Sequence, residues 1–326
     1  MEVQKHFFEI LKTQIPDNYR LVDVVEETLK TSTDSAYRRI RGEKDLSFSE
    51  LHTLCQKYNI SLDEVFSYKS GQNIMFQYMP VNLSDQESYI AYIRRLLSTF
   101  TALKSAQRKD IYFTAQDIPF YHFMDFPELF FFKLYTWNEV LNRVPVSYND
   151  FCSKLDKDTI LPIHKQMSVV YQQIPSKEIW TNQTIDTILK LLEHYFEIGS
   201  FDGKETILLL LDQLSNLMDT IKNYANDGYK GKGVRTPFSL YLSSVDLENN
   251  RTLIKRGENM SCIVRLNNVN SISTENSIFC LEMFQWIEDL ISKSILISGT
   301  AAKERSIFFK TSQNKIDVLI NKIKSS

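Results

Sequence analysis

The sequence is poor in residues that cross-link a chain or turn it sharply. Its 326 residues include only 4 Cys, 8 Pro and 9 Gly. So few Gly and Pro argue against a loop-rich all-β fold. The four Cys form no C-x-x-C pair, which argues against a disulfide framework and against the usual zinc-binding spacings. We therefore expect single buried thiols.

A strong net charge is also missing, because 38 Lys and Arg face 40 Asp and Glu. Any affinity for nucleic acid must then come from a local patch. The most apolar windows, 126–135 and 207–211, fall well short of the ~20 residues of a membrane-spanning helix. The first 17 residues carry Lys and Glu within their apolar stretch and lack a small-residue cleavage site. These absences predict a cytoplasmic protein without membrane contact.

Sequence motifs for catalysis are absent as well. There is no GxSxG, GxGxxG, kinase, EF-hand or HExxH pattern, and the five His share no metal-binding spacing. We therefore predict no enzymatic activity, no cofactor and no metal. Lys230, Lys232 and Arg235 lie among three glycines and could hold an anion, but the P-loop spacing is missing. A solvated interdomain loop is the favoured interpretation of this segment.

The length and the hydrophobic pattern predict two domains joined by a linker. Residues 1–68 contain short amphipathic helices, residues 69–83 form a polar joint, and residues 84–326 form a larger and mostly helical region. Within 238–267, short β-branched and aromatic runs alternate with Asn, Asp and Gly turns, which predicts a small antiparallel β-meander. The predicted fold class is therefore mainly α.

One short helix in the first region combines clear ends with two distinct faces. Ser32 is a good N-cap residue, and Gly42 suits the position just after the helix. Ala36 and Ile40 share an apolar face that can pack on the preceding helix. The opposite face offers hydrogen-bonding and basic side chains, as a helix that enters the major groove of DNA requires.

The segments 21–42, 46–51 and 60–66 together resemble the helix-turn-helix of Cro and phage repressors. This resemblance covers about the first fifth of the chain. It implies a five-helix, lambda-repressor-like domain that binds double-stranded DNA. Over its whole length the chain resembles long, uncharacterised bacterial helix-turn-helix regulators, in the stretches 117–119, 126–129 and 298–305. One departure is that acids, Asp23, Glu26 and Glu27, dominate the helix that often carries a polar phosphate contact in Cro-type domains.

On this interpretation the DNA-binding residues are Ser32, Thr33, Asp34, Tyr37, Arg38, Arg41 and Lys44. We expect Arg38 to contact base edges or a near phosphate and Arg41 to contact phosphate. Residues 32–44 hold four cations against two acids, whereas residues 1–70 hold 10 Lys and Arg against 12 Asp and Glu. The alternative is an interaction module whose five-helix domain binds a protein partner rather than DNA.

The second region has an unusual aromatic concentration, with 11 Phe, Tyr and Trp among residues 112–137. Core packing between helices is the favoured explanation, and a dimer seam or a pocket for an apolar effector is the alternative. His122, Asp117 and Asp125 lie in the same stretch and could hold a polar ligand group. The leading hypothesis is a homodimeric transcription regulator whose C-terminal region dimerises or senses an unknown small-molecule or protein effector.

Overall fold

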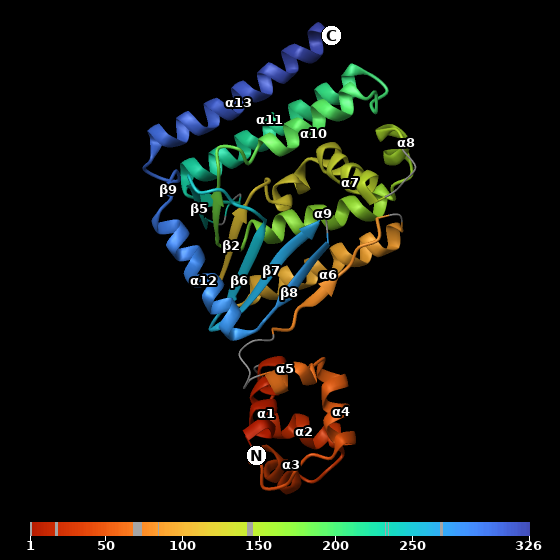
Figure 1. Cartoon of the computed structure of the whole chain (residues 1–326), viewed down its shortest axis with the longest axis vertical. Helices are drawn as coiled ribbons and strands as arrows, with labels where there is room; N and C mark the ends of the chain where they lie inside the picture. The colour runs from red at the N-terminus through yellow and green to blue at the C-terminus, as the bar shows by residue number, and fades with distance from the viewer. Residues whose placement is uncertain are drawn as a thin grey trace. The chain divides into compact units, whose positions relative to one another are not determined.

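The computed structural model describes residues 2–16, 19–67, 74–83, 85–141, 146–231, 233, 235–267 and 270–326. The chain forms two compact units, Met1–Phe76 and Gln77–Ser326 (Figure 1). Part of the linker expected at 69–83 lies outside the described residues. Its later part carries the first strand of the second unit, β1 (Gln77–Met79).

The first unit contains five helices over its described residues. They are α1 (Glu2–Gln14), α2 (Leu21–Leu29), α3 (Thr33–Ile40), α4 (Phe48–Tyr58) and α5 (Leu62–Ser67). Leu11, Val25, Ala36 and Leu54 are completely buried where these helices meet. The α3 helix lies between Ser32 and Gly42, as the sequence predicts.

Local capping explains where these helices begin and end. Ser32 Oγ accepts a hydrogen bond from the backbone nitrogen of Ser35 at 3.3 Å, which begins α3. Ser47 and Glu50 form a reciprocal capping box at the start of α4. Gly42 follows α3 with a φ of 76°, a left-handed conformation that favours glycine. The α3 helix is therefore defined at both ends by its own sequence.

The second unit is built on a mixed sheet of nine strands among its described residues. After β1 come β2 (Lys109–Ala115), β3 (Ser176–Trp180), β4 (Tyr229–Lys230), β5 (Thr236–Leu242), β6 (Arg251–Arg256), β7 (Asn259–Asn267), β8 (Asn270–Thr274) and β9 (Ile295–Leu296). The order is β1-β8-β7-β6-β2-β3-β5-β4, and β9 pairs with the other part of β5. The pairs β2–β3 and β3–β5 are parallel, and the remaining pairs are antiparallel.

Helices lie on both faces of this sheet (Figure 1). They are α6 (Gln86–Ser105), the 3-10 helix η1 (Phe120–Asp125), α7 (Pro127–Leu141), α8 (Tyr148–Ser153), α9 (Lys157–Tyr171), α10 (Asp186–Glu197), α11 (Lys204–Asp227), α12 (Ser277–Ser292) and α13 (Ala302–Ser325). On one face Ile287 of α12 packs with Tyr112 and Leu253 in a small core. On the other face α6, η1, α7, α9 and α11 enclose the main core, and α13 packs against α11.

The prediction of a mainly α fold with a small antiparallel meander is wrong. The second unit is an α/β structure, and β5 is separated from β6 in the sheet by β2 and β3. Both inserted strands lie within the region whose pattern predicted only helices. Because they are central and covered on both sides, they lack the apolar–polar alternation that marks a half-exposed strand. Their parallel pairing also needs helical crossovers, which dominate the sequence pattern around them.

Cys55, Cys262 and Cys280 are buried free thiols, as predicted, whereas Cys152 is half-buried. Burial raises the pKa of the Cys262 thiol to about 12, so this group is a neutral core side chain. Within the ranges given above, no helix has both the length and the apolar character needed to cross a membrane.

Candidate functional site

The outward side of α3 and the turn after it form an exposed surface, which we call the α3 face. Every residue predicted to contact DNA is exposed there, and the set is Ser32, Thr33, Asp34, Tyr37, Arg38, Arg41 and Lys44. Tyr37 keeps 44% of its surface exposed. Ala36 is fully buried on the opposite side of the helix. The structure therefore places the predicted residues on one surface, free of the core.

Arg39 is the exception among the cations of this segment. Its side chain is 5% exposed, and its Nη2 lies 2.5 Å from Glu50 Oε1 on α4. Its Nη1 also donates to the carbonyl oxygen of Ser35 at 3.1 Å. Arg39 thus connects α3 to α4 and is not available to a ligand of the α3 face.

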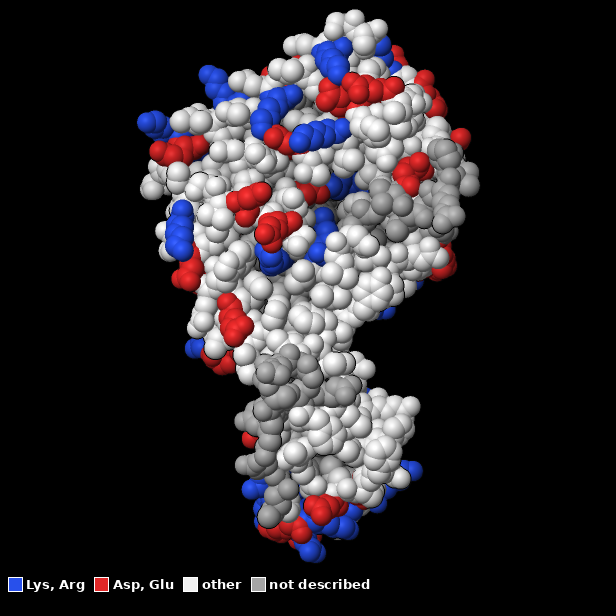
Figure 2. Space-filling model, in the orientation of Figure 1, with Lys and Arg blue, Asp and Glu red and all other residues white. Residues whose placement is uncertain are grey.

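The other cations of the α3 face differ in whether an acid already pairs with them. Arg41 Nε lies 2.9 Å from Glu43 Oε1. Arg38 and Lys44 are exposed and, within the described ranges, form no ion pair. Figure 2 shows basic and acidic side chains side by side over the end of the first unit that carries α3. Arg38 and Lys44 are therefore the cations that a phosphate could reach without breaking an existing pair.

The acids of α2 are engaged with neighbours. Asp23 forms an ion pair with Arg20 at 2.6 Å, and the hydrogen bond from Arg20 holds the pKa of the Asp23 carboxyl below its usual range. Glu27 lies 3.7 Å from Lys57 Nζ. Glu26 accepts a hydrogen bond from Thr33 Oγ1 at 2.8 Å. These contacts partly offset the negative charge that sets this helix apart from the Cro-type pattern.

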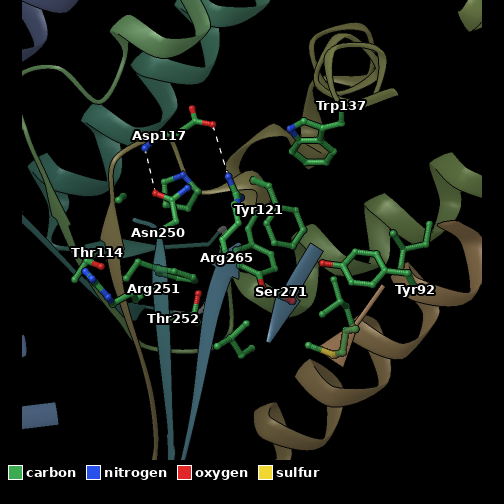
Figure 3. A pocket seen from close by; sticks show the side chains of 18 of the residues that line it. Tyr92, Thr114, Asp117, Tyr121, Trp137, Asn250, Arg251, Thr252, Arg265 and Ser271 are labelled. Atoms are coloured by element: carbon green, nitrogen blue, oxygen red, sulfur yellow. Dashed lines mark hydrogen bonds and ion pairs between the residues drawn. The ribbon is translucent and has the colours of Figure 1, made fainter. Parts of the chain in front are cut away.

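The second unit contains a cavity of about 70 Å³ between the sheet and its helices, which we call the pocket (Figure 3). This volume is several times what one water molecule occupies. Its aromatic lining residues are Tyr89, Tyr92, Phe113, Phe120, Tyr121, Phe130 and Trp137. Its polar lining includes Asp117, Asn250, Thr252, Arg265 and Ser271. An apolar cavity with a few convergent polar groups is the usual form of a small-molecule site.

The pocket lies just beyond the carboxyl end of β2, the strand at which the sheet changes from parallel to antiparallel pairing. On one side β2 pairs in parallel with β3, and on the other side it pairs antiparallel with β6. The chain leaves β2 through Asp117 and enters η1 with Phe120. The pocket is thus lined both by the last residues of β2 and by the loop that follows it.

Asp117 is the acid among the lining residues, which also include Arg251 and Arg265, and it is only 8% exposed. Its Oδ2 pairs with Lys133 Nζ and lies 3.9 Å from Arg265 Nη1. Its backbone nitrogen donates to Asn250 Oδ1 at 3.2 Å, as Figure 3 shows. Its Oδ1 is buried and has no hydrogen-bond partner among the described residues. The carboxylate is thus held firmly by one oxygen and leaves the other unsatisfied.

Two tyrosine hydroxyls and a guanidinium approach the pocket from different elements. Burial raises the pKa of Tyr92 to about 12, although the nearby Arg265 acts in the opposite direction. Burial also raises the pKa of Tyr121 well above its usual value. Both phenols are therefore neutral near pH 7. The Arg265 guanidinium lies 5.9 Å from the centroid of the Trp137 ring.

A second polar group lies in the core behind Tyr121, around the carboxylate of Glu178 on β3. His122 Nε2 lies 3.0 Å from both carboxylate oxygens of Glu178, and Trp180 Nε1 donates to Oε2 at 3.0 Å. The Tyr171 hydroxyl donates to Oε1. Burial would raise the pKa of Glu178, but His122, the Tyr171 hydroxyl and the charge of Lys230 hold it below its usual range. We call these residues the Glu178 cluster, a buried network whose acceptor is well satisfied.

Lys230 adjoins the Glu178 cluster and is 1% exposed. Its Nζ donates to Ser176 Oγ at 2.8 Å and lies 3.4 Å from the centroid of the Tyr171 ring. Burial lowers the pKa of Lys230 to about 7. The interpretation of this segment as a solvated loop is therefore wrong for Lys230, while Arg235 is exposed and Lys232 lies outside the described residues.

The three polar residues noted in the aromatic segment go to three different places. Asp117 lines the pocket, His122 belongs to the Glu178 cluster, and Asp125 accepts a hydrogen bond from Ser168 at 2.5 Å. The aromatic residues of this segment also lie in two places. Phe123 and Phe132 belong to the core, whereas Phe120 and Trp137 line the pocket. Sequence reasoning missed Arg265, and no local pattern could have found it, because 148 positions separate it from Asp117.

In the portion of the chain that the structure describes, no three His, Cys, Asp or Glu side chains gather in a way that could hold a metal ion. No protein-family model, no curated protein and no solved structure shows a significant match to this chain.

Proposed function

We propose that this protein is a DNA-binding transcription regulator. Its first unit contacts double-stranded DNA through the α3 face, and its second unit provides dimerisation or effector sensing. The observation that carries the proposal is that neighbouring arginines of α3 differ in burial. Arg39 is buried against Glu50, whereas Arg38 and Arg41 are exposed beside Tyr37. This arrangement holds the helix on its domain and directs hydrogen-bonding side chains outward, as a major-groove helix requires.

The proposal gives each exposed residue a role. Arg38 contacts base edges or a near phosphate, and Arg41 and Lys44 contact phosphates. Tyr37, Thr33 and Asp34 contact bases or sugars. Ser32 caps α3 with its side chain, so that the N-terminal end of the helix, with its partial positive charge, can face a phosphate.

Homodimerisation is part of this proposal. One eight-residue recognition helix reads only a few base pairs, so useful specificity needs two half-sites about one helical turn apart. A regulator that acts in this way on bacterial DNA works in the cytoplasm. Sedimentation analysis of the full-length chain should give twice the monomer mass.

The experiment is a selection of genomic DNA fragments by the full-length protein at low salt, followed by affinity measurements at rising salt. Affinity for the selected fragments should fall steeply with salt, because phosphate contacts release counterions. The double variant R38A/R41A should lose this binding, whereas the control K12A, which removes an exposed cation on α1, should retain it. Recovery of no fragment above background, or equal loss in the control, would overturn the proposal.

A protein partner for the first unit is the second candidate, and one observation favours it. Phe48, at the start of α4, is 77% exposed, and Tyr19 is 56% exposed. Exposed aromatic side chains are enriched at protein interfaces. If this candidate is correct, F48S should abolish partner binding and leave the fold intact, and R38A/R41A should have little effect on it.

A further inference from the structure

Arg265 lines the pocket with a guanidinium that is not engaged in hydrogen bonds. Its Nη1 lies 3.9 Å from Asp117 Oδ2, beyond hydrogen-bond distance, and within the described ranges its side chain forms no hydrogen bond. Asp117 is in direct contact with Lys133, whose charge offsets that of the carboxylate. The Arg265 side chain is 25% exposed, so a ligand can reach it from solvent. One positive charge at this end of the pocket is therefore available to an anion.

The other arginine of the lining, Arg251, directs its guanidinium away from the pocket. Its Cζ lies 4.9 Å from the centroid of the Trp286 ring on α12. Leu253, two positions further along β6, packs in the small core with α12, so both side chains lie on the α12 face of the sheet. Thr252 lies between them and faces the pocket on the other side. The charge of Arg251 is therefore outside the pocket.

Four hydroxyl groups line the pocket and form no hydrogen bond with the described residues. They belong to Tyr92 on α6, Tyr121 on η1, Thr252 on β6 and Ser271 on β8 (Figure 3). Tyr121 and Ser271 are only 5% and 6% exposed, and Ser271 pairs with Arg265 in the sheet, which places both side chains on one face. Unlike Oδ1 of Asp117, which is enclosed, these four oxygens are accessible from the cavity. Buried hydroxyls without a partner are unfavourable, and a bound acceptor would satisfy them.

The size and the remaining lining of the pocket restrict the anion further. One water-sized group needs about 10–15 Å³ of such a cavity, so the 70 Å³ present accommodate roughly five non-hydrogen atoms. Ile93, Leu96, Phe113 and Ile263 make much of the wall apolar. A doubly charged inorganic ion would exceed the one available positive charge and would lose its hydration against these side chains. A singly charged group with a short aliphatic part fits both the charge and the wall.

We propose that the pocket binds a small monocarboxylate of the size of acetate or propionate. The carboxylate accepts from the Arg265 guanidinium, whose two-pronged geometry it matches, and from the hydroxyls of Tyr121 and Ser271. The aliphatic end packs against the apolar wall. The single negative charge of the ligand balances the positive charge that Arg265 brings to the pocket. The role of this acid as an effector rests on the function proposed above, whereas its binding does not.

The test is equilibrium dialysis of the full-length protein against radiolabelled acetate and propionate, at constant ionic strength and without DNA. At least one of the two acids should bind, with one molecule per chain. Acetamide, which has the shape of acetate without its charge, and inorganic phosphate should displace the bound acid about tenfold or more weakly than the unlabelled acid does. The absence of saturable binding by either acid, or equal displacement by acetamide or phosphate, would refute the proposal.

Three variants locate the site. R265Q should weaken binding about tenfold or more, whereas the control R256Q, at an exposed arginine of β6, should bind like the parent chain. Y121F keeps the ring, removes one donor and should weaken binding by about two- to tenfold. Near-ultraviolet circular dichroism establishes that each variant is folded. Unchanged affinity in R265Q would overturn the proposal. The outcome does not depend on DNA binding, since α3 belongs to the other unit and no DNA is present.

Discussion

The buried Arg39 on α3 and the half-buried Glu50 on α4 form an ion pair, with 2.5 Å between Nη2 and Oε1. Glu50 has a second contact, because its carboxylate also accepts from the backbone nitrogen of Ser47 in the capping box of α4. One side chain therefore begins α4 and connects it to α3. This connection fixes which arginine points inward and, as a consequence, which ones remain exposed on the α3 face.

Replacement of Arg39 should destabilise the first unit. We expect R39A to lower its free energy of unfolding by about 2–4 kcal/mol, because the change leaves a partly buried carboxylate without its partner. The neighbouring control R38A removes an exposed side chain and should change it by less than about 0.5 kcal/mol. Urea unfolding of the full-length chain measures both. Equal effects of the two substitutions would contradict the assignment of Arg39 as the inward residue.

Acid should weaken the same ion pair. The hydrogen bond from Arg39 is the main cause that lowers the pKa of Glu50 in the folded protein. The Glu50 carboxylate of the folded state therefore binds a proton less readily than that of the unfolded chain. The stability that this difference contributes is present above about pH 4.5, and it is lost as the pH falls through the lowered folded pKa. The stability difference between the parent chain and E50Q should shrink as the pH is lowered from 6 to 3. Gln preserves the capping box, so the variant isolates the charge. A difference that does not change with pH would argue against this role.

Lys230 should give the second unit an alkaline pH dependence. Burial lowers its folded pKa to about 7 from 10.5 in the unfolded chain. Unfolding between about pH 7 and 10.5 therefore takes up a proton, so the free energy of unfolding rises with pH in this interval. K230M should remove this part of the slope, as measured by thermal unfolding at pH 7 and pH 9. Parallel pH profiles for the two proteins would show that Lys230 does not titrate in this interval.

The arginines of the α3 face should differ in their effect on DNA recognition. If Arg38 contacts a base edge, R38A should cost about 1–3 kcal/mol of binding free energy and relax preference at one position of the site. If Arg41 contacts phosphate, R41A should weaken binding to all sequences similarly and reduce the slope of affinity against salt by about one unit. Binding titrations with single-base variants of a selected fragment at several salt concentrations separate the two. If both variants weaken binding to all sequences alike, neither arginine reads a base.

The helices of residues 2–67 and the two faces of α3 follow from the sequence alone. Their determinants are local: apolar residues at helical spacing, Ser32 and Ser47 at the caps, and Gly42 with a positive φ. Such interactions act between residues a few positions apart, so they can be recognised without knowledge of the rest of the fold. Even there the sequence did not show that Arg39 differs from Arg38, because that difference requires Glu50 on another helix.

Only the tertiary structure decided the architecture of the second unit and the composition of the pocket. The positions of β2 and β3 between β5 and β6 depend on strand pairings across long stretches of chain. Tyr92, Asp117 and Arg265 become neighbours because α6, the end of β2 and β7 meet around one cavity, and Lys230 becomes buried because β4 lies beside the sheet core. Burial and pairing of this kind are properties of contacts between distant residues, and a local pattern in the sequence does not contain them.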